Sequence, residues 1–310
     1  MGSFLDKPIT EKHSSVTLGE LDGKRLWHAV SSMQGWRVSM EDSHIHEIGI
    51  GGYEELSAFG VFDGHGGAMT ANYLEANLLK DLCASPLFSS LKGVSGESNA
   101  NELGEVLRQG FISIDATLRT IEVVRCNQDN SGSTGVMCMV TPTHYIVANC
   151  GDSRLLICSK KEVKLATADH KPSNVEERER IENAGGKVSF NRVSGDLAVS
   201  RAFGDFVYKG NAELPAEKQM VSPEPDISIL KRDFESDHFI VVACDGIWDV
   251  MTNDAVRVFV VEEMARGYPL DYICECLIDK CLNLNSRDNM SVIIVALPAS
   301  PDSIGSLERP

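Results

Sequence analysis

Apolar residues along this chain gather into short runs, each about one buried strand long. Two of these runs, Ser57–Phe62 and Phe239–Cys244, are followed directly by Asp-Gly pairs that begin at Asp63 and Asp245. A carboxylate at the end of a rigid strand is held firmly, and the glycine beside it lets other groups approach the backbone closely. The pattern therefore predicts a shared acidic site, built around metal. Further strand-like runs lie at residues 26–50, 135–140, 145–149, 155–159 and 290–297.

Helical spacing of apolar residues predicts two pairs of long helices, together with a shorter helix after Ser173–Glu176, which fits a capping box. The shorter helix should end at Gly185–Gly186. Because the strand-like runs mostly follow one another without a helix between them, we expect antiparallel sheets rather than a doubly wound fold. The predicted class is α+β. The long helices are expected at residues 68–83, 101–124, 254–266 and 270–284.

Two carboxylates are expected to meet at one edge of the first sheet. Asp42 directly precedes the strand-like run Ser43–Ile50, and Asp63 directly follows Ser57–Phe62. If the two runs form an antiparallel hairpin, both carboxylates lie at the same edge. Cross-strand neighbours are about 4.5–5.5 Å apart, so the two groups would repel each other unless a cation lies between them.

The same reasoning applies to a second pair of runs late in the chain. Asp288 comes just before the buried run 290–297. If that run lies antiparallel to Phe239–Cys244, Asp288 shares an edge with Asp245. Which strands are neighbours is left open by the sequence, so both pairings are hypotheses at this point.

The domain organisation follows from composition along the chain. We find no internal repeat and no Pro- or Gly-rich linker, so residues 25–297 are expected to form a single domain. Residues 1–24 are polar and mixed, and are expected to form an N-terminal arm. The tail 298–310 contains three prolines and should be flexible.

Composition and charge restrict the classes of function. The 310 residues carry a formal net charge of −16, which disfavours nucleic acid as a partner and suits a protein that collects divalent cations. There is neither an apolar stretch long enough to cross a membrane nor a secretory signal. The nine cysteines form no Cys-x-x-Cys pair, which fits a reducing compartment, and we expect a cytoplasmic protein. A nuclear location in addition to the cytoplasm is left open.

Nine ordered motifs between residues 28 and 297 together resemble the metal-dependent type-2C protein serine/threonine phosphatases (the PPM family). One Asp-Gly-His alone would mean little, but nine motifs in the order of the family are hard to obtain by chance. The opening Met1–His13 also resembles the start of the animal alpha and beta forms, whose C-terminal helical extension is missing here. The motifs are Gly35–Asp42, Val61–Gly67, Gly132–Thr134, Asn149–Arg154, Asp169–Pro172, Leu197–Asp205, Val221–Pro225, Cys244–Val250 and Ser286–Ser291.

The resemblance implies a central sandwich of two antiparallel sheets with a pair of helices outside each, a four-layer αββα fold. It also implies two Mn²⁺ or Mg²⁺ ions, bridged by Asp63. Oxygen donors suit these hard cations and disfavour zinc. Metal ligands are implied at Glu41, Asp42, Asp63, Gly64 (through its carbonyl), Asp245 and Asp288.

The resemblance assigns three catalytic roles. Arg37 matches the phosphate-binding arginine, whose planar fork suits two phosphate oxygens. His65 matches the general acid that protonates the leaving group, although it could instead only tune the metal-bound water. Asp63 completes the catalytic set. Asp152 and Asp249 match residues of a weaker third metal site, or they form structural hydrogen bonds in tight turns.

Several features leave alternatives open. His44 and His46 are two residues apart and share a strand face, which could mimic a metal pair, but no third nitrogen ligand stands nearby in the motif. Gly2 is a candidate for myristoylation and hence for membrane contact, although Asp6 stands where the motif has Ser or Thr. The family's flap corresponds to residues of about 171–195 and is expected to select among phosphoproteins.

Three functions compete. The leading hypothesis is a monomeric Mn²⁺- or Mg²⁺-dependent phosphatase that hydrolyses phospho-Ser and phospho-Thr in proteins with a metal-activated water. The second is a pseudophosphatase that binds phosphoproteins without turnover, but such a protein should have lost a metal carboxylate, and none is missing. The third is a metallo-phosphodiesterase, against which the acidic charge and the motifs both argue.

Overall fold

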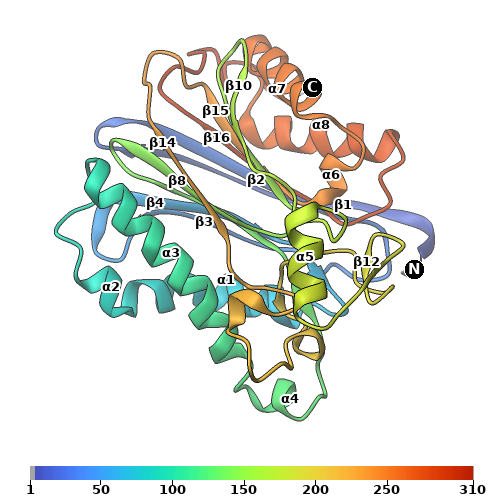
Figure 1. The fold of residues 1–310 in the computed structure, drawn as a ribbon. Helices are drawn as coiled ribbons and strands as arrows, with labels where there is room; N and C mark the ends of the chain where they lie inside the picture. Colours follow the sequence, from blue (N-terminus) through green and yellow to red (C-terminus); the bar gives the residue numbers. More distant parts are fainter. Residues whose placement is uncertain (1–3, 310) are drawn as a thin grey trace.

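The computed structural model describes residues 4–309, and two antiparallel sheets form its centre (Figure 1). The six-stranded sheet contains, in spatial order, β1 (Phe4–Leu21), β2 (Lys24–Arg37), β16 (Met290–Ala296), β15 (Phe239–Ala243), β9 (Arg154–Cys158) and β10 (Val163–Ala166). The five-stranded sheet contains β14 (Asp226–Lys231), β8 (His144–Cys150), β7 (Gly135–Val140), β4 (Tyr53–Phe62) and β3 (Ser43–Ile50). The predicted α+β class with antiparallel sheets is confirmed.

Alternation of side chains along the strands gives each sheet one face toward the other sheet and one face toward helices. Phe59 and Val61 of β4 pack between the sheets, together with Val242 of β15. The intervening Val241 and Ala243 of β15 instead face the helical layer. Because both faces are covered, the central strands β7, β8, β15 and β16 are apolar almost throughout and buried along their whole length, which explains their continuous apolar runs.

One pair of long helices covers each outer face, which completes the four layers (Figure 1). Helices α1 (Met69–Ala84) and α3 (Glu97–Leu118) pack on the five-stranded sheet. Helices α7 (Asn253–Arg266) and α8 (Leu270–Asn283) pack on the six-stranded sheet. The short helices are α2 (Pro86–Ser89), α4 (Glu122–Arg125) and α6 (Asp245–Trp248). The predicted helix at 101–124 is thus two helices, α3 and α4, and α3 begins earlier than expected.

Small elements surround one end of the sandwich. A three-stranded sheet contains β13 (Phe203–Gly204), β6 (Gly132–Ser133) and β5 (Gly64–His65), and a hairpin contains β11 (Val188–Ser189) and β12 (Arg192–Val193). The remaining elements are helix α5 (Val175–Asn183) and the 3-10 turns η1 (Phe206–Tyr208) and η2 (Ala216–Lys218). The segment of about 171–195, for which the sequence predicts a flap, contains α5 and this hairpin.

Helix α5 forms where the sequence predicts it. The capping box predicted at Ser173–Glu176 does not form. Asn174 is the N-cap residue and makes no side-chain capping bond; its amide donates instead to the carbonyl of Asp169 at 2.8 Å. The carboxylate of Glu177 is engaged by Arg180 and Arg201. The helix ends before Gly185, which has a left-handed φ of +91°.

The predicted N-terminal arm is wrong for most of its length, because Phe4–Leu21 forms the long edge strand β1. Its residues are polar because an edge strand is covered on one side only, so composition there resembles that of a free segment. Residues 1–3, including the lipidation candidate Gly2, lie outside the described residues.

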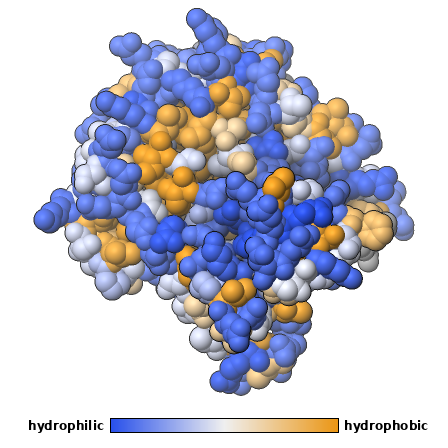
Figure 2. All heavy atoms as spheres, viewed as in Figure 1, coloured by the Kyte–Doolittle hydropathy of each residue, from blue (hydrophilic) through white to orange (hydrophobic). Residues whose placement is uncertain are grey.

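The tail also differs from the prediction. Ile304 is buried in the apolar cluster beneath α7 and α8, and the Leu307 N–H donates to the carbonyl of Gly267 at 3.0 Å. Among residues 4–309, no helix is long and apolar enough to cross a membrane. Hydrophilic residues cover most of the face in Figure 2, as the net charge leads one to expect.

Candidate metal centre

Both strand pairings that were hypotheses in the sequence are present. Ser43 pairs with Phe62 in the β3–β4 hairpin, so Asp42 and Asp63 leave the same edge. Strands β15 and β16 are antiparallel, with Ala243 opposite Val292. The two sheets meet at this end, since ligand atoms of Asp42, Asp63 and Cys244 all lie within 4.8 Å of one another.

The carboxylates destabilise one another's charged forms. Burial raises the pKa of Asp63 well above its ordinary value, and the nearby charges of Asp245, Asp42 and Asp288 raise it further. Burial and the carboxylates of Asp152 and Asp288 act on Asp245 in the same direction. The pKa of Asp42 rises to about 7, chiefly through burial. So many like charges in one buried place call for a cation.

The donor atoms fit such a cation. Among the described residues, neither carboxylate oxygen of Asp42 has a hydrogen-bond partner, and Oδ1 of Asp245 has none either. Buried polar atoms are normally paired, so these oxygens remain available as ligands. They are hard donors, which suit Mn²⁺ and Mg²⁺.

Glu41 and Gly64 lie against each other beside this cluster. The Ser39 hydroxyl donates to Oε1 of Glu41 at 2.6 Å, and the Gly67 N–H donates to Oε2 at 3.3 Å. A Cβ atom at Gly64 would collide with the backbone carbonyl of Glu41. Glycine is therefore required at position 64 by close approach of the two backbones.

Arg37 lies at the end of β2 and joins the cluster through Asp288. Its Nη2 donates to Oδ2 of Asp288 at 2.6 Å, while its buried Nε has no partner among the described residues. Burial lowers the pKa of Arg37, but the adjacent Asp288 carboxylate outweighs this and the net shift is upward. The guanidinium is therefore held charged, with part of its fork free for an anion.

His65 lies at the end of β5 and pairs with a residue to which the sequence had assigned no role. Its Nε2 is 2.7 Å from Oδ2 of Asp205. Burial would lower the pKa of His65, but the Asp205 carboxylate raises it above the ordinary value. Gly132 makes room for the pair, because a Cβ there would collide with both side chains.

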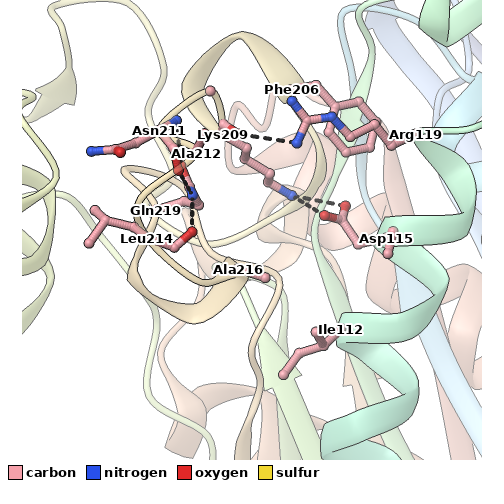
Figure 3. A pocket seen from close by; sticks show the side chains of 12 residues that line it. Ile112, Asp115, Arg119, Phe206, Lys209, Asn211, Ala212, Leu214, Ala216 and Gln219 are labelled. Carbon is pink, nitrogen blue, oxygen red and sulfur yellow. Dashed lines mark hydrogen bonds and ion pairs between the residues drawn. The ribbon is translucent and has the colours of Figure 1, made fainter.

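A buried ion pair between Lys209 and Asp115 fixes the segment that carries Asp205 (Figure 3). Lys209 Nζ lies 2.9 Å from Oδ1 of Asp115 on α3 and donates to the carbonyl of Ala202 at 2.8 Å. Oδ1 of Asp115 also accepts the Gly204 N–H at 2.8 Å. The cavity shown there, of about 330 Å³, opens between α3 and the 206–219 loop, and none of its lining residues belongs to the acidic cluster.

Asp152 and Asp249 lie near Asp245, since the charges of both act on its carboxylate. The ammonium of Lys171 forms an ion pair with the buried carboxylate of Asp152. Burial raises the pKa of Asp249, Lys171 lowers it, and Asp152 raises it again. Lys171 thus supplies positive charge to both carboxylates.

Sequence reasoning quoted Asp205, Lys171 and Asn289 inside motifs but gave them no role. Asn289 joins two loops, since its Oδ1 accepts the Glu41 N–H at 2.9 Å and its amide donates to the carbonyls of Gln34 and Ser39 at 2.8 and 3.0 Å. Neither Asp205 nor Lys171 borders a buried apolar run, so the strand-end pattern that found the aspartates could not find them. Asn289 directly precedes the run 290–297, but that pattern concerns carboxylates only.

Comparisons with known proteins find similar chains that are named phosphatases. The family model described as "Protein phosphatase 2C" matches residues 27–290. The chain is 45% identical to Protein phosphatase ppm-1.A of Caenorhabditis elegans, over 97% of this chain and 65% of that protein. It is 44% identical to human Protein phosphatase 1A, over 97% of this chain and 77% of that protein. A crystal structure of a phosphatase from Toxoplasma gondii superposes with a TM-score of 0.74 at 26% identity, covering 94% of this chain and 96% of the other.

Proposed function

Because the chain belongs to the protein phosphatase 2C family, and so is a metal-dependent serine/threonine protein phosphatase, we propose that it hydrolyses phospho-Ser and phospho-Thr by direct attack of water activated by two metal ions. The observation that carries the mechanism is the convergence of buried carboxylates from both sheets next to a guanidinium. Phosphoproteins are then the partners.

The metal ligands proposed are the carboxylates of Asp63, Asp245, Asp288, Asp42 and Glu41, together with the carbonyl of Gly64. Asp63 is placed as the bridging ligand, because it stands between the carboxylates of the two sheets. When bound, Mn²⁺ or Mg²⁺ ions supply Lewis acidity and an activated water aimed at phosphorus. The chain's own residues then have to hold the phosphoryl group in line with that water.

Arg37 is proposed to hold the phosphate. Its fork offers two parallel N–H donors to two phosphate oxygens, a geometry that fixes both position and orientation. The Nε of Arg37 has no hydrogen-bond partner among the described residues, which supports this role because it could donate to the phosphate without giving up another bond. On substrate binding, the 2.6 Å contact with Asp288 would be shared with the phosphate or lost to it.

His65 is proposed as the general acid. A serine or threonine alkoxide is a poor leaving group, and a proton donated to its oxygen is worth roughly 10²–10⁴ in rate. Asp205 is placed as the positioning residue, because its carboxylate lies against Nε2 and favours the protonated imidazole. The opposite nitrogen, Nδ1, then has to face the leaving oxygen.

Asp152 and Asp249 are proposed as ligands of a weaker third ion. The ammonium of Lys171 competes for the same negative charge, which would explain why such an ion binds weakly. The pseudophosphatase alternative loses support because no carboxylate of the centre is replaced. A monomeric, cytoplasmic protein, lipid-modified at Gly2 if the N-terminal motif is functional, remains a prediction for mass spectrometry and fractionation.

The test is hydrolysis of a phospho-Thr peptide by the full chain, with and without chelator. Activity should vanish on chelation and return when Mn²⁺ is added back. Activity that survives exhaustive chelation would contradict the metal mechanism, while tight phosphopeptide binding without turnover in Mn²⁺ would favour the pseudophosphatase.

A further inference from the structure

A cavity of about 340 Å³ opens beside the short helix α4, and the charged residues that line it are both arginines. Arg119 follows the last residue of α3, and Arg125 is the last residue of α4. Asn127 and Asn130 line the cavity from the loop that leads to β6, and Phe206 lines it from η1. No carboxylate of residues 4–309 is part of the lining of this arginine cavity.

Arg119 is held in place without being neutralised. Its Nη1 donates to the backbone carbonyl of Lys209 at 3.2 Å, and its guanidinium carbon lies 5.4 Å from the centre of the Phe206 ring (Figure 3). Neither contact supplies negative charge, and Asp115, one turn earlier on α3, is paired with Lys209. A guanidinium that already rests on an aromatic ring loses less conformational freedom when it binds an anion.

Arg125 is exposed and forms no hydrogen bond or ion pair with a residue that the structure describes. Glu122 precedes it by three residues on α4 without pairing with it, and Oδ1 of Asp129 accepts the N–H and the hydroxyl of Ser131 at 2.9 and 2.6 Å. One unpaired surface arginine would indicate little. Two of them share this cavity in a chain with 45 acidic and 29 basic residues, which makes it a positive site on a negative protein.

The arginine cavity adjoins the proposed general acid. Phe206 directly follows Asp205, whose carboxylate contacts His65 at 2.7 Å. Asn130 lies against the residue after His65, since a Cβ atom at Gly66 would be 3.9 Å from the carbonyl oxygen of Asn130. A general acid faces the oxygen that leaves with the substrate's polypeptide. The substrate residues that flank the phosphorylated one therefore lie on the same side of the centre as this cavity.

We propose that the arginine cavity binds an aspartate or glutamate of the substrate close to the phosphorylated residue, so that the chain prefers phosphoproteins with acidic residues there. This inference rests on the proposed function, in which His65 protonates the leaving oxygen. A guanidinium offers two parallel N–H donors to the two oxygens of a carboxylate. Phe206 and Val207, which is 73% exposed, offer apolar surface to the methylene groups of the same side chain.

The test compares three phospho-Thr peptides with the full chain in Mn²⁺. One peptide has glutamines on both sides of the phospho-Thr, and the other two have glutamates in place of the glutamines either before it or after it. We expect kcat/KM to be about fivefold higher for one of the acidic peptides than for the neutral peptide, chiefly through a lower KM. Equal values of kcat/KM for all three peptides would overturn the proposal.

Variants at Arg125 assign the preference to the cavity, and they should fold because this side chain forms no bond in the structure. Arg125→Gln should reduce the preference to about twofold or less, and Arg125→Glu should reverse it, because the new carboxylate repels the acidic peptide. The matched control is Arg266→Gln, which removes the same charge from an exposed position on α7 and should keep the full preference. An unchanged preference in Arg125→Glu, or an equal loss in Arg266→Gln, would also overturn the proposal.

A binding measurement separates this inference from the proposed function. Fluorescein-labelled forms of the three peptides are titrated with Asp63→Asn, with and without Arg125→Glu, and binding is followed by fluorescence anisotropy. Tighter binding of one acidic peptide, lost with Arg125→Glu, would support the arginine cavity even if no peptide is hydrolysed, a result that would contradict the proposed function alone. Equal binding of all three peptides would count against the cavity whether or not the natural chain is active.

Discussion

Nε2 of His65 and Oδ2 of Asp205 lie 2.7 Å apart, although 140 residues separate them in the chain. The contact joins the end of β5 to the loop after β13, and Asp205 adopts a left-handed φ of +49° to make it. A non-glycine residue in that conformation is uncommon and carries a cost in free energy. The surrounding bonds from Asp115 and Lys209 hold it there.

Asp205→Asn should change the pH dependence of hydrolysis. A general acid works while protonated, and Asp205 raises the pKa of His65, so activity should persist to higher pH in the natural chain than in the variant. The alkaline limb of kcat against pH, measured with a phospho-Thr peptide, should therefore move to lower pH. An unmoved limb would remove Asp205 from this role.

His65→Ala should affect substrates according to their leaving groups. We expect a loss of roughly 10²–10⁴ in kcat for a phospho-Ser peptide and a much smaller loss for an aryl phosphate, whose phenolate needs less protonation. Both rates are measured on the same preparation in Mn²⁺. Equal losses on the two substrates would indicate that His65 acts on the nucleophile or the metal instead.

Asp63→Asn should abolish turnover, because it removes the charge that stands between the carboxylates of both sheets. Circular dichroism should show an intact fold. Asp302→Asn, which alters only an exposed partner of Arg25, is the matched control and should retain full activity. Near-normal turnover of Asp63→Asn in Mn²⁺ would refute the bridging assignment.

Arg37→Lys tests whether shape or charge holds the phosphate. Lysine keeps the positive charge beside Asp288 but lacks the planar fork, so the substrate would be misplaced. We expect a loss on the order of 10² in kcat/KM. If the lysine variant performs as well as arginine, charge alone is sufficient.

Glu177→Gln should lower stability and change its dependence on acid. Burial raises the pKa of Glu177, but its bonds and ion pairs with Arg201 and Arg180 bring it down to about 2. A carboxyl group whose pKa is lower in the folded state than in the unfolded state stabilises the fold when it is ionised. For Glu177 this contribution is complete above pH 4.5 and is lost as the pH falls toward 2.

The cost at neutral pH should be about 3–5 kcal/mol in urea unfolding, because two arginines lose a buried carboxylate. The natural chain should lose stability between pH 4.5 and 2, and the variant should lose less over that window. Glu105→Gln, on the exposed pair with Arg108, should cost roughly 0.5 kcal/mol or less. Parallel pH curves for Glu177→Gln and the natural chain would contradict the linkage.

Residues at the ends of strongly apolar strands could be located from the sequence. Strands buried on both faces have continuous apolar runs, and such runs can be recognised in a sequence. Asp63 and Asp245 were found in this way, and antiparallel pairing then located Asp42 and Asp288. β1 was missed because an edge strand has no continuous apolar run. Asp205 and Lys171 were missed as functional residues because their contacts depend on loops whose course no periodicity records.

The acidic centre draws Asp42 and Asp63 from one sheet and Asp245 and Asp288 from the other, with an apolar layer as the spacer between them. The distances between the metal ligands therefore depend on how the two sheets are aligned. A cavity in that layer, for instance in Val242→Ala, would let the sheets shift relative to each other. The distances between the ligands would then change and turnover would fall, although no group that touches substrate is altered. On heating, catalysis should accordingly fail before the helices melt.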